Sequence, residues 1–244
     1  MSLLDTVEIP RRTMVLFFLV DTSGSMIGSK IGAVNSAIEE LLPEIESISE
    51  ENADAKIKVA VLQFSTGAKW LYDKPQEAKD IKWTYLDSDG LTDFGQACIN
   101  LNEKLSRNEF MEDVTGCFAP AIFLLSDGEP TDEYEKGLSI LKENKWFKKA
   151  IKVAVAIGDD ANMDVLKEFT GNIETVLKVH TPEALKKMIR FVSVTASQIG
   201  SKSSGAGITE NGDIISKQEQ FVQEIKYNLD GTDLEDFEDD DNEW

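Results

Sequence analysis

Two kinds of apolar pattern alternate along this chain, and the alternation restricts the fold more than any other feature. Short runs of continuous apolar residues indicate strands buried on both faces, whereas apolar residues at every third or fourth position indicate helices. Buried strands that alternate with amphipathic helices predict an α/β fold, a doubly wound and mostly parallel central sheet with helices on both faces. Strands are predicted at residues 14–20, 58–64, 121–125, 152–157 and 175–179, and helices at 31–45, 96–105, 133–144, 162–170 and 182–199.

Weaker signals add detail to this outline. Residues 69–72 and 81–85 are predicted as short strands beside 58–64, the former as an antiparallel edge. Pro43 predicts that the helix from residue 31 kinks or ends there. Gly171 is predicted to end the helix that precedes it, and Pro182 to begin the last long helix.

The length of 244 residues suits one domain of about 200 residues. We expect an N-terminal segment at 1–11, the domain at 12–200 and a C-terminal extension at 201–244. Within the extension, 201–207 resembles a linker, Asn211-Gly212 is a hairpin-turn signal, and 217–227 fits a short amphipathic helix. From Asp230 to Trp244 there are nine acids and no base, so this tail is predicted to be disordered by itself.

The charge balance limits the classes of partner. Forty-five acids against 25 lysines and arginines give a net charge of −20, which disfavours nucleic acid and anionic membrane surfaces. No run reaches the roughly 18 apolar residues of a membrane helix. The apolar run 14–20 follows two arginines but ends in Asp21 rather than a small-residue cleavage site, which favours a buried strand over a signal peptide. With no targeting signal found, we expect a cytoplasmic protein.

Histidine and cysteine are scarce. One histidine, His180, and two cysteines, Cys98 and Cys117, exclude a zinc site rich in these residues within this chain. One disulfide could form by count alone, but two reduced thiols are the prediction for a reducing compartment.

Oxygen-bearing side chains gather where predicted strands end. Asp21, Ser23 and Ser25 follow the strand 14–20, Asp127 follows 121–125, and Thr92 lies in a loop between them. Open α/β sheets bind ligands at the carboxyl ends of their strands. Carboxylates and hydroxyls together suit Mg²⁺ or Mn²⁺ rather than zinc. Any one of these residues could simply cap a helix, but the five together at this spacing predict a metal site.

The motif resembles a known family over about residues 12–200. Asp-x-Ser-x-Ser after an apolar strand, with Thr92 and Asp127 at 71 and 106 positions after Asp21, is similar to the von Willebrand factor A domain. The resemblance implies a metal-ion-dependent adhesion site. Ser23 and Ser25 would bind the ion directly, Thr92 directly or through water, and Asp21 and Asp127 through water. One position would stay open for an Asp or Glu carboxylate of a partner protein.

A narrower resemblance rests on residues 18–26, 31–37, 157–161 and 191–197. These segments are similar to the cytoplasmic bacterial TerY-type branch, which is associated with tellurite resistance and related stress-response gene clusters. The acidic extension after residue 200 is not part of that family pattern.

The predicted function is divalent-cation-dependent protein binding, not catalysis. Hydroxyl ligands place little negative charge on the ion, so it stays electrophilic and binds an incoming carboxylate favourably. Mg²⁺ is the expected ion, with Mn²⁺ as the substitute and Ca²⁺ a poorer fit. Met26, Asp93 and Glu129 are predicted to form a rim that contacts the partner, although Asp93 could instead be a loop cap and Glu129 an exposed loop acid.

Two other functions stay open at this stage. A haloacid-dehalogenase-like, Mg²⁺-dependent phosphatase would use Asp21 as nucleophile, but Ser23 occupies the place of its second aspartate. A metal-free scaffold would bind its partners equally well in chelator. The acidic tail is either a solvated segment or an arm that supplies a carboxylate to the metal of its own or a neighbouring chain, which would allow self-association.

Overall fold

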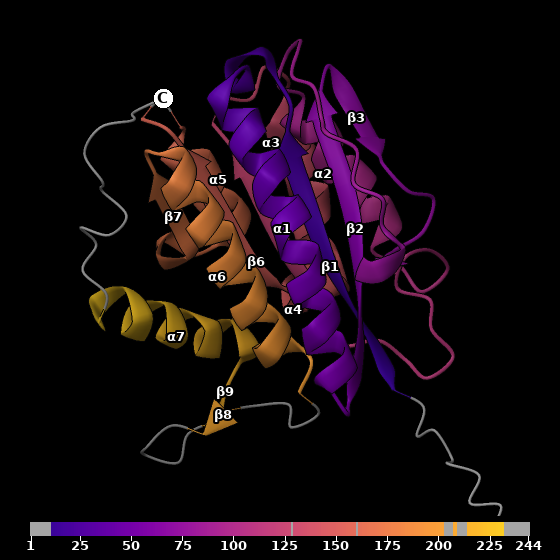
Figure 1. Cartoon of the computed structure of the whole chain (residues 1–244). Helices are drawn as coiled ribbons and strands as arrows, with labels where there is room; N and C mark the ends of the chain where they lie inside the picture. Colours follow the sequence, from indigo (N-terminus) through magenta and orange to yellow (C-terminus); the bar gives the residue numbers. More distant parts are fainter. Residues whose placement is uncertain (1–10, 128, 160, 203–206, 209–213, 232–244) are drawn as a thin grey trace, which may run out of the picture.

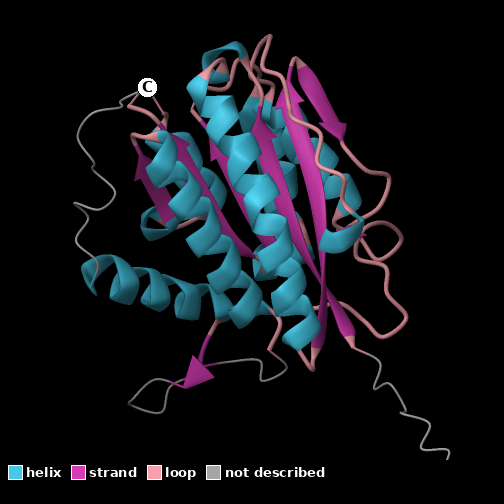
Figure 2. Cartoon of the chain, in the orientation of Figure 1, coloured by secondary structure: helices cyan, strands magenta, loops and turns pink. Residues whose placement is uncertain are grey.

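The computed structural model describes residues 11–127, 129–159, 161–202, 207–208 and 214–231. One twisted sheet forms the centre of the molecule, and helices cover both of its faces (Figures 1 and 2). The strand order is β3-β2-β1-β5-β6-β7, with β4 also paired to β2. The strands are β1 (Arg12–Asp21), β2 (Ala55–Ser65), β3 (Gly67–Trp70), β4 (Gln76–Glu77), β5 (Ala121–Ser126), β6 (Ile151–Ile157) and β7 (Val176–Val179).

The sheet is mostly parallel, as predicted. The strands β2, β1, β5, β6 and β7 pair in parallel, and only β3 and β4 run antiparallel to β2. β1 lies in the middle because its side chains after Arg12 are buried on both faces of the sheet. Alternate residues of β1 enter two separate apolar clusters, Leu16 and Phe18 on one face and Phe17 and Leu19 on the other.

Helices fill the two outer layers. α1 (Ser29–Glu51) and α6 (Pro182–Gly200) pack side by side on one face (Figure 1). The apolar cluster on the other face takes residues from α2 (Phe94–Lys104), α3 (Tyr134–Glu143), α4 (Lys145–Lys149) and α5 (Met163–Thr170). The prediction of an α/β fold with both faces covered is therefore confirmed.

The predicted strand at 81–85 is wrong. In the structure this segment belongs to an irregular loop, and the short strand in the region is β4 at Gln76–Glu77. Directly after this segment, the backbone of Leu86 binds α1 and not a strand: the side chain of Asn35 donates to the carbonyl of Leu86 at 2.9 Å and accepts from the amide of Leu86 at 2.8 Å. The helix thus satisfies backbone groups that a neighbouring strand would otherwise bind.

Pro43 does not end α1, which continues to Glu51. Proline removes one backbone hydrogen bond, but Leu41, Leu42 and Ile45 around it are buried in the core, and this packing keeps the helix intact. The signals of the later helices are confirmed. Gly171 ends α5 with a positive φ of 77°.

The chain beyond residue 200 adds a helix to the fold. α7 (Lys217–Gly231) packs against α6 and β6, and its Phe221 and Ile225 are buried in the core cluster of the α1 and α6 face. Two short strands, β8 (Gly207–Ile208) and β9 (Ile214–Ile215), pair antiparallel on either side of the predicted Asn211-Gly212 turn. That turn, and the acidic tail from residue 232 onward, lie outside the described residues.

Cys98 and Cys117 are both free thiols, and both are buried. Burial raises the pKa of the Cys117 thiol to about 11 and raises that of Cys98 as well. Across the described ranges, every helix is too short or too polar to cross a membrane.

Candidate metal centre

Asp21 is the buried centre of the polar cluster at the carboxyl edge of the sheet. It ends β1, and its two carboxylate oxygens accept hydrogen bonds from the Ser23 amide at 2.9 Å and the Ser126 hydroxyl at 2.6 Å. Ser126 reaches Asp21 because β5 and β1 are parallel neighbours. Burial raises the pKa of Asp21 and the charge of Asp127 adds to the rise, whereas the hydrogen bonds oppose it. A nearby cation would stabilise the charged form of a buried acid of this kind.

Ser23, Ser25 and Asp127 lie next to one another. A short 3-10 turn, η1 (Gly24–Met26), folds the chain after β1 so that the Ser23 and Ser25 hydroxyl oxygens are 3.0 Å apart. The Ser25 hydroxyl donates to Asp127 Oδ1 at 2.7 Å. Because that hydroxyl gives its proton to a carboxylate, the lone pairs of its oxygen remain available to a cation. Ser23 is buried and Ser25 is exposed.

Thr92 is held between the two loops that carry these residues. Its amide donates to the Thr131 hydroxyl and its carbonyl accepts from the Thr131 amide, both at 2.9 Å. On the other side, the Gly24 amide donates to the carbonyl of Gly90 at 3.1 Å. Gly90 has a φ of 84°, which favours glycine at this turn. Within the described ranges, the Thr92 hydroxyl makes no hydrogen bond, so it remains available as a ligand.

Lys30 is a cluster member that the sequence reasoning missed. It lies in the first turn of α1, and its Nζ is 2.5 Å from Asp127 Oδ2. The Asp127 side chain has no exposed surface and that of Lys30 is only 17% exposed. Both oxygens of Asp127 are therefore engaged, one by Ser25 and one by an ammonium group. A signal existed in the sequence, since Lys30 is the only basic residue between Arg12 and Lys56.

The three predicted rim residues have different surroundings. Met26 is a correction, because its side chain is fully buried in the core and the exposed apolar residue of this turn is Ile27, at 64%. Asp93 accepts a hydrogen bond from the Gly67 amide at 2.7 Å and so positions the turn into β3. Glu129 is exposed and accepts from the Asn162 side chain at 3.1 Å.

Asp132, which lies beside the motif in sequence, caps a helix. Its two carboxylate oxygens each accept a backbone hydrogen bond at 3.0 Å, from Gly95 and from Gln96. It thus satisfies two free amides at the start of α2. Asn162 likewise caps α5 through the amides of Asp164 and Val165.

The donor set fits a hard divalent ion rather than a soft one. In the part of the chain that the structure describes, there is no group of three His, Cys, Asp or Glu side chains suited to a metal. The cluster instead combines two buried carboxylates, Asp21 and Asp127, with hydroxyl oxygens. Oxygen ligands of this type are those of Mg²⁺ and Mn²⁺.

Comparison with known proteins identifies the fold family. The profile of the von Willebrand factor type A domain matches residues 16–191, which is most of the chain. The chain belongs to the von Willebrand factor type A family. Domains of this family mediate protein–protein interactions through a metal-ion-dependent adhesion site and are generally interaction or adhesion modules. No curated protein sequence matches the chain.

Solved structures share the fold at low sequence identity. A von Willebrand factor type A protein from Catenulispora acidiphila is 16% identical with a TM-score of 0.58, over 81% of this chain and 44% of that one. The ArnB paralog VWA2 from Sulfolobus acidocaldarius is 20% identical with a TM-score of 0.56, over 84% and 53%. Proximal thread matrix protein 1 from the mussel byssus, with a zinc-occupied adhesion motif, is 16% identical with a TM-score of 0.56, over 74% and 47%. This von Willebrand factor type A chain therefore spans about half the length of these proteins.

Proposed function

We propose that this von Willebrand factor type A domain binds a partner protein through a divalent cation. The proposed ligands are Asp21, Ser23, Ser25, Thr92 and Asp127. The observation that carries the proposal is the hydrogen-bonded cluster in which Asp21, Ser23, Ser25 and Asp127 converge from the ends of two neighbouring strands. Mg²⁺ is the proposed ion, with Mn²⁺ as a substitute. Zinc occupies the corresponding motif of the mussel byssus protein and is the ion to compare with them.

The chemistry of the cluster supports binding rather than catalysis. In the proposed site the direct ligands are neutral hydroxyl oxygens, while Asp21 accepts a hydrogen bond from the Ser23 amide and Asp127 accepts one from the Ser25 hydroxyl. An ion held in this way keeps much of its positive charge and attracts a further carboxylate. The proposed partner group is therefore an Asp or Glu side chain of another protein, with Asp93 and Glu129 at the rim.

The narrower biological role is also a proposal. The resemblance to the TerY-type branch supports a cytoplasmic protein of a bacterial stress or tellurite-resistance system. A strain that carries Asp21→Ala in place of the native residue should then lose tellurite resistance to the same extent as a strain that lacks the protein. Unchanged resistance in both strains would contradict this role and leave the metal site untouched.

Isothermal titration calorimetry tests the metal site directly. Mg²⁺ and Mn²⁺ should give saturable heats with the native protein and none with the double variant Asp21→Ala, Ser23→Ala. A matched control replaces Asp73 and Ser47, an exposed acid and an exposed hydroxyl on other elements, by alanine and should bind the ion normally. Equal heats in all three proteins would refute the site.

The binding function needs a second measurement, because a metal site alone does not make an interaction module. Affinity for a partner should fall sharply when EDTA removes the ion and return when Mg²⁺ is restored. Association that is equally strong in EDTA would favour a metal-free scaffold.

A further inference from the structure

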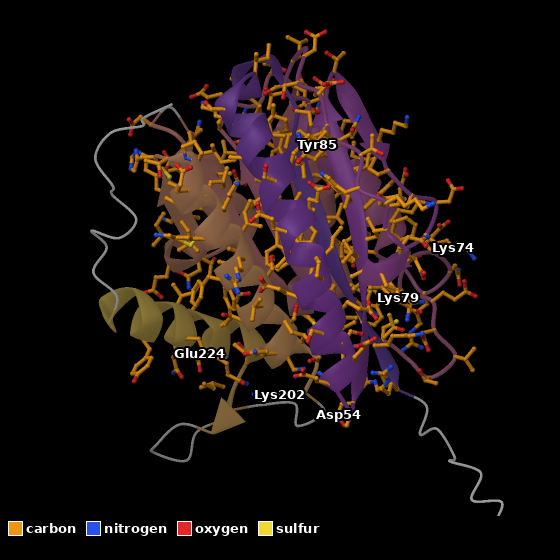
Figure 3. The ribbon with its side chains drawn as sticks, in the orientation of Figure 1. Asp54, Lys74, Lys79, Tyr85, Lys202 and Glu224 are labelled. Carbon is orange, nitrogen blue, oxygen red and sulfur yellow. The ribbon has the colours of Figure 1, made fainter. Side chains whose placement is uncertain are left out.

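A pocket of about 440 Å³ opens at the amino-terminal edge of the sheet, opposite the metal cluster. We refer to it as the basic pocket. Nine residue steps of β1 separate Arg12 at this edge from Asp21 at the other, a distance of about 30 Å. Figure 3 shows Lys202 at this end of the molecule, beneath α6 and α7. The side chains that characterise the basic pocket are those of Arg12, Phe118, Lys148, Lys149, Lys202 and Lys217.

Two cations of the pocket share one aromatic ring. The Arg12 guanidinium lies 4.1 Å from the centroid of the Phe118 ring, and the Lys217 ammonium lies 4.9 Å from it. Their hydrogen bonds go to backbone carbonyls, from Arg12 to Cys117 at 2.8 Å and from Lys217 to Gly200 and Lys202 at 2.5 and 3.0 Å. Burial and the nearby charge of Arg12 lower the pKa of Lys217 to about 8. Two like charges therefore lie against the same ring, and no carboxylate of the described residues pairs with either.

The pocket carries positive charge that the described residues do not neutralise. Lys148 pairs with Glu143 at 2.8 Å. Across the described ranges, Arg12, Lys149, Lys202 and Lys217 form no ion pair with a carboxylate. This is notable in a chain with 45 acids, 25 lysines and arginines and a net charge of −20. An anion bound here would relieve the repulsion and desolvation of these cations.

The chain itself provides a segment of the opposite charge close by. Residues 232–244 contain eight acids and no base, and Glu238–Asp241 is an unbroken run of four. α7 begins at the pocket with Lys217 and, with 15 residues, carries the chain about 20 Å away. The acidic run begins seven residues after Gly231, and an extended chain spans about 3.3–3.6 Å per residue. That length of about 23 Å or more suffices to bring the run back to the pocket.

We propose that the basic pocket binds the acidic segment 238–243 of the same chain. Four cations that form no ion pair with a described carboxylate would meet four consecutive acids, and the covalent link through α7 raises the local concentration of the segment to the millimolar range. The tail is then held about 30 Å from the metal cluster, at the far edge of the sheet. The partner site stays open to carboxylates of other proteins, and the tail itself shields a basic surface. This inference does not depend on the metal site.

Competition with a labelled peptide tests the proposal in the full-length chain. The probe is a fluorescent peptide of residues 232–244, and the readout is its anisotropy at low salt. A tail-neutralised chain (Glu238→Gln, Asp239→Asn, Asp240→Asn, Asp241→Asn) should bind the probe at least about tenfold more tightly than the native chain, whose own tail competes. High salt should weaken binding, because it screens exposed charges.

Variants that remove charge from the basic pocket test whether the peptide probe binds there. Lys149→Gln with Lys202→Gln, added to the tail-neutralised chain, should weaken probe binding by about five- to tenfold, the effect of losing two exposed ion pairs. Both lysines are exposed, so the fold should not be disturbed. The matched control removes two exposed lysines elsewhere, Lys74→Gln and Lys82→Gln, and should leave affinity unchanged.

Each alternative binding site of the acidic tail predicts a different experimental result. Equal probe affinity for the native and tail-neutralised chains would overturn the proposal, as would a pocket variant that binds like its control. Probe binding that is lost in EDTA or on Asp21→Ala would assign the tail to the metal cluster. A concentration-dependent dimer in sedimentation velocity, absent from the tail-neutralised chain, would assign the tail to the pocket of a second copy.

Discussion

Replacing Lys30 by methionine should strengthen binding of Mg²⁺ at the proposed metal centre. In the structure the Lys30 ammonium binds Asp127 Oδ2, so a positive charge already sits against one of the proposed ligands. A divalent ion must displace this ammonium or tolerate its repulsion. Methionine keeps most of the length and apolar surface of lysine but removes the charge.

The size of the effect follows from the geometry of the pair. A hydrogen bond between charged groups contributes about 1.5–3 kcal/mol when it is largely shielded from water. Asp127 is fully shielded and Lys30 is 17% exposed, so the pair falls in this class. Because 1.4 kcal/mol corresponds to a factor of ten in Kd, the variant should bind Mg²⁺ about 10- to 100-fold more tightly.

The same ion pair predicts that Lys30→Met also changes the stability of the fold. Without metal, Lys30→Met leaves the buried Asp127 carboxylate without its cation and should lower the free energy of unfolding by about 1.5–3 kcal/mol. Saturating Mg²⁺ should restore most of this loss, since the ion then supplies the missing charge. At a metal concentration of 100 times Kd, the stabilisation by binding alone is about 2.7 kcal/mol.

Calorimetric titration and urea denaturation, each with and without Mg²⁺, measure both quantities. Lys30→Arg is the control, because it keeps the positive charge and should bind Mg²⁺ no more tightly than the native protein. An unchanged or weaker affinity in Lys30→Met would refute the argument that the ammonium competes with the ion.

The remaining predictions concern packing and the Cys117 thiol. Phe221→Ala should lower the free energy of unfolding by about 3–5 kcal/mol, because the Phe221 ring on α7 is fully buried. Tyr227, on the same helix, is 80% exposed, so Tyr227→Ala should change this free energy by less than about 0.5 kcal/mol. Equal effects of the two variants in urea denaturation would show that α7 does not pack as described. Gly137→Ala should destabilise by about 1–3 kcal/mol, since its new Cβ would lie 2.2 Å from the Gly95 carbonyl oxygen. Gly32→Ala, in open space on α1, should instead stabilise by about 0.5–1 kcal/mol, and thermal denaturation that gives both variants the same sign would contradict this packing. With a pKa of about 11 for Cys117, its thiolate fraction at pH 8 is about one in a thousand, so mass spectrometry should find it unmodified by iodoacetamide until the pH rises towards 11 or urea unfolds the chain.

Local periodicity accounts for most of the fold that could be predicted. The five parallel strands and their helices were found because each has a continuous apolar run or a helical period within its own residues. The prediction of a strand at 81–85 was wrong because the local pattern did not decide the structure of this segment. Its alternation of Ile81 and Trp83 resembles a strand, but strand pairing is a long-range contact, and the next residue, Leu86, has its backbone bound by the side chain of Asn35, 51 positions earlier.

The candidate site was predictable in part because strand ends have fixed positions in a parallel sheet. Asp21 and Asp127 had to meet once β1 and β5 were neighbours. Met26 was misplaced because whether a residue in a turn points into the core or outward depends on packing and not on its neighbours in sequence. Lys30 was missed because nothing in its own segment shows which acid it contacts.

The sequence by itself determined which segments become strands and helices, and that hydroxyl and carboxylate oxygens lie at the strand ends, since both properties belong to contiguous stretches of chain. Only the tertiary structure decided where the cations lie. Lys30 meets Asp127 across 97 positions, and Arg12 meets Lys217 over the Phe118 ring. Such contacts depend on how completed elements pack against one another, and no periodic pattern along the chain encodes them.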